Sequence, residues 1–263
     1  MSKSEINFPL WDCLKRGGLS LWLNRQALLP LTALPVGVTF VTLALIRTYA
    51  PADVSHFTQA LFQIPSDLAI GLFCSLILVI IMNAPKKNTK DPVTFNLNLA
   101  DKKRVMFAGA VAHVVFSYLY IGAFAGTDLI AAPLREASAA KQEVRLDLTL
   151  LVIGMLVFGV YAIRFALLPI LIVAGLDIKD FYRRFKGFGL SFPVLFIKLA
   201  TTFTLGILIL LPLGAMTPPD GETLTLAQGI VVDFAAAFAA VLSHAWGYAA
   251  LAIGMRYMID GDA

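Results

Sequence analysis

Long apolar segments separated by short charged ones make up most of this chain. Six segments are long enough to cross a bilayer, because about 20 apolar residues in a helix span a hydrocarbon core of roughly 30 Å. Their apolar residues run continuously, which favours helices over barrel strands. The pattern predicts an all-α, polytopic transmembrane helix bundle, a single integral membrane domain over 1–263, with spans near 27–48, 65–84, 105–127, 148–172, 193–215 and 229–255.

The composition agrees with a membrane protein. Apolar residues account for 59% of the chain and charged residues for 14%, whereas soluble domains average about 45–50% and 25%. A water-soluble surface would need more polar residues at this size, so lipid must cover much of the protein. The net charge is +4, but no long basic run or zinc-finger spacing is present. Nucleic acid is therefore not an expected partner.

The distribution of Lys and Arg predicts the orientation of the spans. Fifteen of these residues fall in 1–26, 85–104, 173–192 and the C-terminal tail, and four fall in the segments of the opposite side. Cytoplasmic segments carry the excess of basic residues. We therefore expect a multi-pass membrane protein with both termini in the cytoplasm. Charged residues interrupt the first 26 residues, so a cleavable signal peptide is not expected.

Two segments on the basic side have amphipathic patterns. In 177–189, Ile178 and four aromatic residues fall at helical spacing on one face, opposite charged residues. This pattern predicts a helix lying in the headgroup plane, with a plain connector as the alternative. Residues 8–25 show a weaker version of the pattern. We expect Gly17 and Gly18 to break or bend a helix there.

Ionisable side chains inside a span are costly in lipid and mark candidate functional positions. Asp233 and His244 lie in the sixth span, eleven residues apart. Eleven residues are close to three helical turns, so both side chains point the same way, about 16 Å apart along the axis. With His113 in the third span, they are candidates for a polar track for protons or a substrate. The alternative is structural: Asp233 reaches the interface and His244 bonds to a neighbouring helix.

Arg164 lies sixteen residues into the fourth span, where its guanidinium cannot face lipid. Pro169 follows five residues later and kinks or ends a helix. We therefore expect Arg164 to mark the inner interface, where the chain bends toward 177–189, with bonding of Arg164 inside the bundle as the alternative. Lys198, near the cytoplasmic start of the fifth span, is interpreted in the same way. The basic residues here predict a cationic patch for anionic lipid headgroups, made of Arg183, Arg184, Lys186 and Lys198.

Signatures of enzymes and metal sites are missing from the sequence. It contains no phosphate-cradling glycine loop, zinc-protease histidine pair, nucleophile elbow or close carboxylate pair. Two intramembrane histidines without a nearby carboxylate or cysteine cluster do not indicate a metal. The two cysteines, Cys13 and Cys74, fall in a cytoplasmic segment and a span, so a disulfide between them is not expected. We expect no cofactor, no metal and no enzymatic activity.

The order of features resembles a bacterial inner-membrane family of six-span proteins, the YciC-like group, and the membrane domain attached to some glycerophosphoryl diester phosphodiesterases. The similarity lies in WDCLKRGG at 11–18, in Asn24-Arg25, and in RFALLP at 164–169 followed by an amphipathic stretch ending in Lys186-Gly187. The resemblance implies an integral role in the bacterial inner membrane and carries over no catalytic residues, since the phosphodiesterase domain of those proteins is missing here.

The sequence therefore supports two functional hypotheses. The first is a non-enzymatic membrane protein that acts through anionic lipids or a protein partner in envelope maintenance. The second is a small transporter or channel component that uses the polar track. Small residues at four-residue spacing, such as Ala250 and Gly254, permit close helix approach within the bundle or in a homo-oligomer. The substrate, the partner and the oligomeric state do not follow from the sequence.

Overall fold

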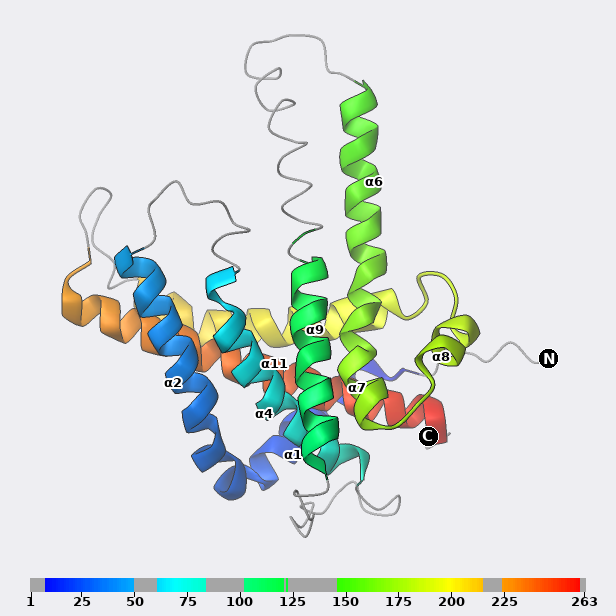
Figure 1. Cartoon of the computed structure of the whole chain (residues 1–263), viewed down its shortest axis with the longest axis horizontal. Helices are drawn as coiled ribbons and strands as arrows, with labels where there is room; N and C mark the ends of the chain where they lie inside the picture. Colours follow the sequence, from blue (N-terminus) through cyan, green and yellow to red (C-terminus); the bar gives the residue numbers. More distant parts are fainter. Residues whose placement is uncertain are drawn as a thin grey trace.

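A computed structural model describes residues 8–49, 61–83, 102–120, 122, 146–214 and 224–260 of the chain. About 91% of these described residues are helical, and none of them lies in a strand. The predicted all-α helical bundle is thereby confirmed. Figure 1 shows the helices with their labels.

Five helical segments are long and apolar enough to cross a membrane, which makes this a multi-pass helical membrane protein. They match five of the six predicted spans, and they are Arg25–Tyr49, Ile64–Met82, Thr149–Val173, Ser191–Ile209 and Leu226–Ile259. The first two are α2 (Arg25–Tyr49) and α4 (Ile64–Met82), and the last belongs to α11 (Leu226–Asp260).

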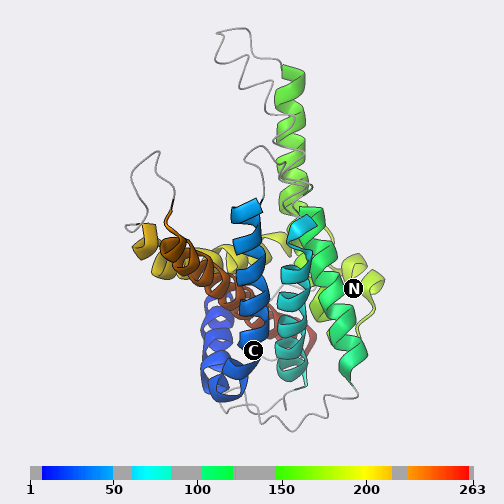
Figure 2. The ribbon, with the colours of Figure 1, turned by 60° about the vertical axis from the view of Figure 1, so that its left-hand side comes forward.

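The remaining predicted span, 105–127, is helical over 102–120, but this helix is not among the five candidates. Its first turn holds Lys102, Lys103 and Arg104, which lower its mean hydropathy. Residues 123–127 lie outside the described part of the chain. The helix of residues 102–120 stands beside α4, and α4 in turn stands beside α2 (Figure 2).

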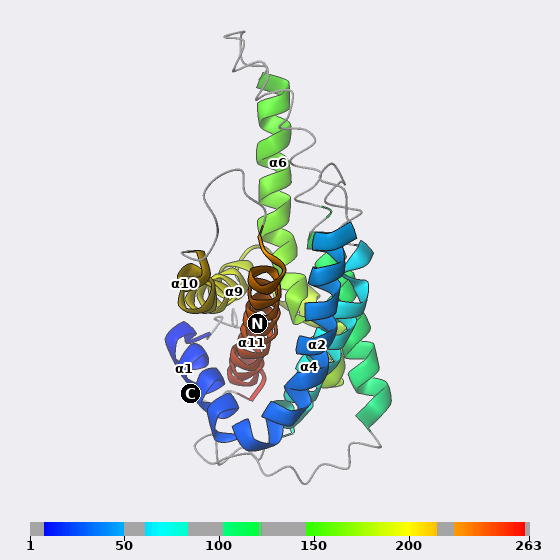
Figure 3. The same cartoon turned by 90° about the vertical axis from the view of Figure 1, so that its left-hand side faces the viewer.

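Helix α11 lies at the centre of the structure. It contacts α2, α4, α1 (Leu10–Leu23) and α9 (Ser191–Leu205). Figure 3 looks along α11, with α1 and α9 on one side and α2 and α4 on the other. Its 35 residues correspond to about 52 Å, which exceeds a hydrocarbon core of roughly 30 Å. This excess length agrees with Figure 1, in which α11 is strongly inclined to the upright helices and runs across them.

Small residues on α11 let its neighbours approach closely, as the sequence pattern at Ala250 and Gly254 indicates. The side chains of Ala249 and Ala250 are fully buried. A Cβ added to Gly254 would overlap the ring of Phe8, and one added to Gly247 would lie 3.2 Å from Thr201 Oγ1. Helices in membranes associate through close van der Waals packing of this kind, because lipid provides no hydrophobic drive between them.

The prediction that Gly17 and Gly18 break a helix is wrong, because α1 continues through both residues. A Cβ added to Gly17 would lie 2.7 Å from the Ala250 backbone nitrogen, and one added to Gly18 would lie 3.3 Å from the Trp246 indole nitrogen. Trp246 donates from this nitrogen to the Leu14 carbonyl over 2.9 Å. The two glycines thus bring the backbone of α1 against α11.

Two of the spans change their helical pitch beside a proline. The fourth consists of α6 (Leu146–Ala162), the 3-10 turn η1 (Ile163–Leu167) and α7 (Leu168–Val173). Pro169 has no amide hydrogen and its ring clashes with the preceding turn, which favours the break at η1. The fifth span continues from α9 into the π-helical turn η2 (Gly206–Leu210) and α10 (Leu211–Gly214), which contains Pro212.

Replacing Gly17 with Val should detach α1 from α11. The new side chain would meet the Ala250 backbone, which cannot rotate away, and such overpacking costs about 1–3 kcal/mol. We expect a lower thermal unfolding temperature in detergent and faster proteolysis near the N-terminus.

The matched control is Gly37→Val, because an added Cβ at Gly37 meets nothing within 4 Å. Equal stability of the two valine variants would contradict the close packing of α1 on α11.

Candidate functional site

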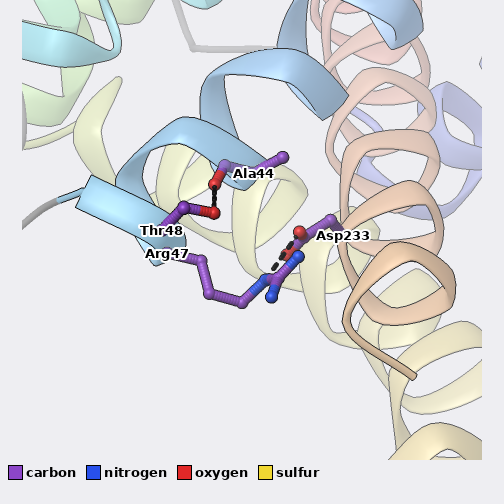
Figure 4. A network of polar contacts seen from close by, with 4 residues as sticks. All are labelled: Ala44, Arg47, Thr48 and Asp233. Carbon is purple, nitrogen blue, oxygen red and sulfur yellow. Dashed lines mark hydrogen bonds and ion pairs between the residues drawn. The ribbon is translucent and has the colours of Figure 1, made fainter. Parts of the chain in front are cut away.

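At one end of α11, Asp233 forms an ion pair with Arg47 of α2. The Arg47 Nε donates to Asp233 Oδ2 over 2.9 Å, and Figure 4 shows the two side chains meeting between the helices. Gly229 lies one turn earlier on α11, and an added Cβ there would lie 2.5 Å from the Arg47 guanidinium. Gly229 therefore provides the space that Arg47 occupies. The pair ties Asp233 to a structural contact between α2 and α11.

Inside the bundle, His113 meets His244 and Tyr248 of α11. The two imidazole rings are 5.3 Å apart and perpendicular, and His113 Nδ1 is 2.8 Å from the Tyr248 hydroxyl. His244 Nδ1 is 2.8 Å from the Ala240 carbonyl, so this nitrogen must carry the hydrogen. The structure thus brings together the two histidines of the predicted track, whereas Asp233 pairs with Arg47.

Tyr248 is a member of this cluster that sequence reasoning missed. It is fully buried, and it lies four residues after His244, on the same face of α11. That spacing was a signal in the sequence. Among the described residues, His113 Nε2 is buried without a hydrogen-bond partner. A buried polar atom of this kind is costly in a bundle that lipid surrounds.

Lys198, which was predicted to belong to the cationic patch, packs against α11 in the structure. Lys198 Nζ lies 4.0 Å from the centre of the Tyr248 ring, inside the contact between α9 and α11. The sequence did not reveal this contact, because the hydropathy of a span does not show which face of the helix packs on a neighbour. We call Lys198, Tyr248, His113 and His244 the buried polar cluster. It combines an ammonium group, a phenol and two imidazoles.

Arg164 holds the chain after the fourth span against η1. Its side chain is 1% exposed, and its guanidinium donates to the carbonyls of Gly187 over 3.0 Å and Tyr182 over 3.5 Å. The group also lies over the rings of Tyr161 and Tyr182, at 4.8 and 4.6 Å. These contacts occur where the chain bends toward 177–189.

Tyr182 completes the contact from the other side. Its hydroxyl donates to the Arg164 carbonyl over 3.0 Å. Burial raises the pKa of this hydroxyl above its ordinary value, and the nearby Arg164 charge opposes part of that rise. The phenol therefore keeps its proton at neutral pH and remains a donor. Gly187 has a φ of 77°, a left-handed conformation that favours glycine.

The predicted amphipathic helix is present as α8 (Ile178–Arg184). Asp177 caps it by accepting from the Asp180 amide over 2.7 Å. Its apolar face packs on the protein in part, since Phe181 and Phe185 are buried, whereas Ile178 and Phe188 are 37% and 38% exposed. The side chains of three basic residues are exposed, and we call them the basic patch: Arg183, Arg184 and Lys186.

The cysteines lie apart from these groups. Cys13 and Cys74 are free and buried, in agreement with the expectation that they form no disulfide. Burial and the Asp12 charge raise the pKa of the Cys13 thiol to about 12, so it remains protonated and unreactive at neutral pH. Within the described part of the chain, no three His, Cys, Asp or Glu residues are grouped so that they could hold a metal ion.

Comparison with models of known protein families, with curated proteins and with solved structures finds no match to this chain. The fold and its contacts define the class, which is a multi-pass helical membrane protein with buried polar side chains at helix contacts.

Replacing Arg164 with Met should lower the free energy of unfolding by about 2–5 kcal/mol, because hydrogen bonds to a charged group each contribute about 1.5–3 kcal/mol. Arg164→Lys should also be destabilising, since an ammonium cannot reproduce a planar guanidinium that bonds two carbonyls and stacks on rings. Thermal unfolding in detergent measures both effects.

Arg183→Lys is the matched control, because the Arg183 side chain is 71% exposed. Full stability of Arg164→Met would show that the contacts of Arg164 do not hold α8.

Proposed function

We propose that this protein is a non-enzymatic integral protein of the bacterial inner membrane that associates with anionic phospholipids at its cytoplasmic face, in the maintenance of the cell envelope. The observation that carries the proposal is the way Arg164 fastens the segment that bears the basic patch. A basic cluster next to a membrane span attracts anionic headgroups, with about 1 kcal/mol per residue near the surface.

The arrangement of the helix ends supports the proposed orientation. Three of the four segments that carry the excess of basic residues line one pocket of about 410 Å³, to which they contribute Lys102, Gly175 and Arg256 among others. Arg47 and Asp233 lie at helix ends that the proposal places on the opposite side. In this orientation, both termini and the basic patch are cytoplasmic.

Reversing the basic patch with Arg183→Glu, Arg184→Glu and Lys186→Glu should weaken the association with anionic lipid about tenfold or more. The full-length protein is reconstituted in nanodiscs that contain equal amounts of phosphatidylcholine and phosphatidylglycerol. The enrichment of phosphatidylglycerol around the protein is then measured by mass spectrometry. High salt should reduce the enrichment around the wild type, since the patch is exposed.

The control reverses three basic residues of the segment between the third and fourth predicted spans, Arg135, Lys141 and Arg145. The proposal fails if both triple variants lose enrichment equally, or if the wild type shows none.

The buried polar cluster favours a second candidate function, a small transporter or channel component that conducts protons. The perpendicular approach of two imidazoles at 5.3 Å inside the bundle is the specific observation. Intramembrane ionisable groups of this kind occur in proton relays, and neutral histidines can both accept and donate protons.

If the cluster conducts protons, His113→Gln and His244→Gln should each abolish proton flux into reconstituted vesicles under an imposed gradient. A pH-sensitive dye inside the vesicles measures the flux. Asp233→Asn should leave it intact, because Asp233 pairs with Arg47 outside the cluster. Absence of flux through the wild type excludes this second candidate, as would equal flux in all variants.

A further inference from the structure

An apolar groove lies inside the elbow between α1 and α2. The two helices meet at Asn24, whose side chain donates to the Ser20 carbonyl over 2.8 Å, and the elbow lies beside α11 (Figure 3). The groove has a volume of about 450 Å³, within the range of about 300–1,000 Å³ typical of ligand pockets. Its walls are almost wholly apolar and include Leu28, Leu29, Phe73, Phe238, Leu242 and Leu205.

A single cation, Arg25, stands among the groove residues, at the elbow end. The Arg25 guanidinium lies 4.4 Å from the centre of the Trp22 ring and donates to the Trp22 carbonyl over 2.9 Å. Arg and Trp side chains are typical anchors at the membrane interface. The indole thus holds the positive charge at the mouth of the groove.

The groove runs inward from this charge along α2. Arg25, Leu28, Leu29 and Thr32 line it in succession, over a helical rise of about 10 Å. The groove is open on its outer side, since the side chains of Trp22 and Leu29 are 64% and 56% exposed. A molecule in the surrounding bilayer can therefore enter from the side.

We propose that this groove binds one anionic phospholipid, with an acyl chain along α2 and the phosphate at Arg25. Three features support this occupant: the apolar walls match a hydrocarbon chain, the charge at the mouth matches a phosphate, and their order along α2 matches a lipid of the cytoplasmic leaflet. This inference rests on the proposed role in anionic-lipid association and adds a second, built site to the basic patch. The patch attracts headgroups by charge, whereas the groove also holds the chain.

The test is native mass spectrometry of the full-length protein after reconstitution with equal phosphatidylcholine and phosphatidylglycerol and extraction into a mild detergent. The wild type should retain one phosphatidylglycerol molecule. Leu29→Trp fills the groove and should abolish retention of either lipid. Arg25→Gln should lower the preference for phosphatidylglycerol about fivefold, in line with the attraction of one surface charge.

Leu34→Trp is the matched control, because Leu34 lies on the same helix with 65% exposure and is not among the groove residues. It should retain lipid as the wild type does. The proposal is overturned if the wild type retains no lipid, if both tryptophan variants behave alike, or if a protein occupies the groove instead.

The two lipid sites can fail independently in these experiments. If only the basic patch is wrong, its charge reversal leaves the enrichment in nanodiscs unchanged while Leu29→Trp still abolishes the retained lipid. If only the groove is wrong, enrichment responds to the patch variant, and the wild type emerges from detergent without a bound lipid.

Discussion

Close approach of neighbouring helices to the small residues of α11 is the constraint on which the other contacts depend. Gly17 of α1 meets the backbone at Ala250, and Phe8 covers Gly254. Because backbones come this near, lipid is excluded from the contacts, and polar groups placed there are shielded. Lys198 reaches α11 because α9 packs directly on it. His113 reaches α11 because the helix of residues 102–120 lies beside α4, which itself packs on α11.

Some of the polar contacts hold the fold together, and one group of them is a candidate for chemistry. Arg164 bonds two carbonyls and stacks on two rings, and these contacts fasten the turn after the fourth span. The pair of Arg47 with Asp233 joins α2 to α11 in the same sense. The buried polar cluster differs from both, since it brings two imidazole rings within 5.3 Å of each other beside a phenol, whereas each of the other two contacts joins an arginine to oxygen acceptors. This difference is why the cluster, and not Asp233, supports the second candidate function.

Hydropathy was enough to predict the helical class and five spans, because lipid requires long apolar segments whatever their packing. The pattern around Phe181 and Phe185 likewise identified α8, since helical periodicity is local. Gly17 was misjudged because glycine serves equally to end a helix and to admit a neighbour, and only the partner helix decides. The contact of Lys198 with Tyr248 was missed for a related reason. Arg47 and Asp233 are 186 residues apart in sequence, and no local pattern relates two residues at such a distance.

The central position of α11 also has a consequence for biosynthesis. A ribosome delivers chains from the N-terminus, so α11, which most of the other described helices contact, enters the membrane after all of them. Before that point, the common partner of α1, α2, α4 and α9 has not yet been inserted. Lys198 then has no contact with the ring of Tyr248. The described helices therefore reach their final packing only when α11 inserts among spans that are already in place, and a chain that stops before this helix would leave those spans without a core.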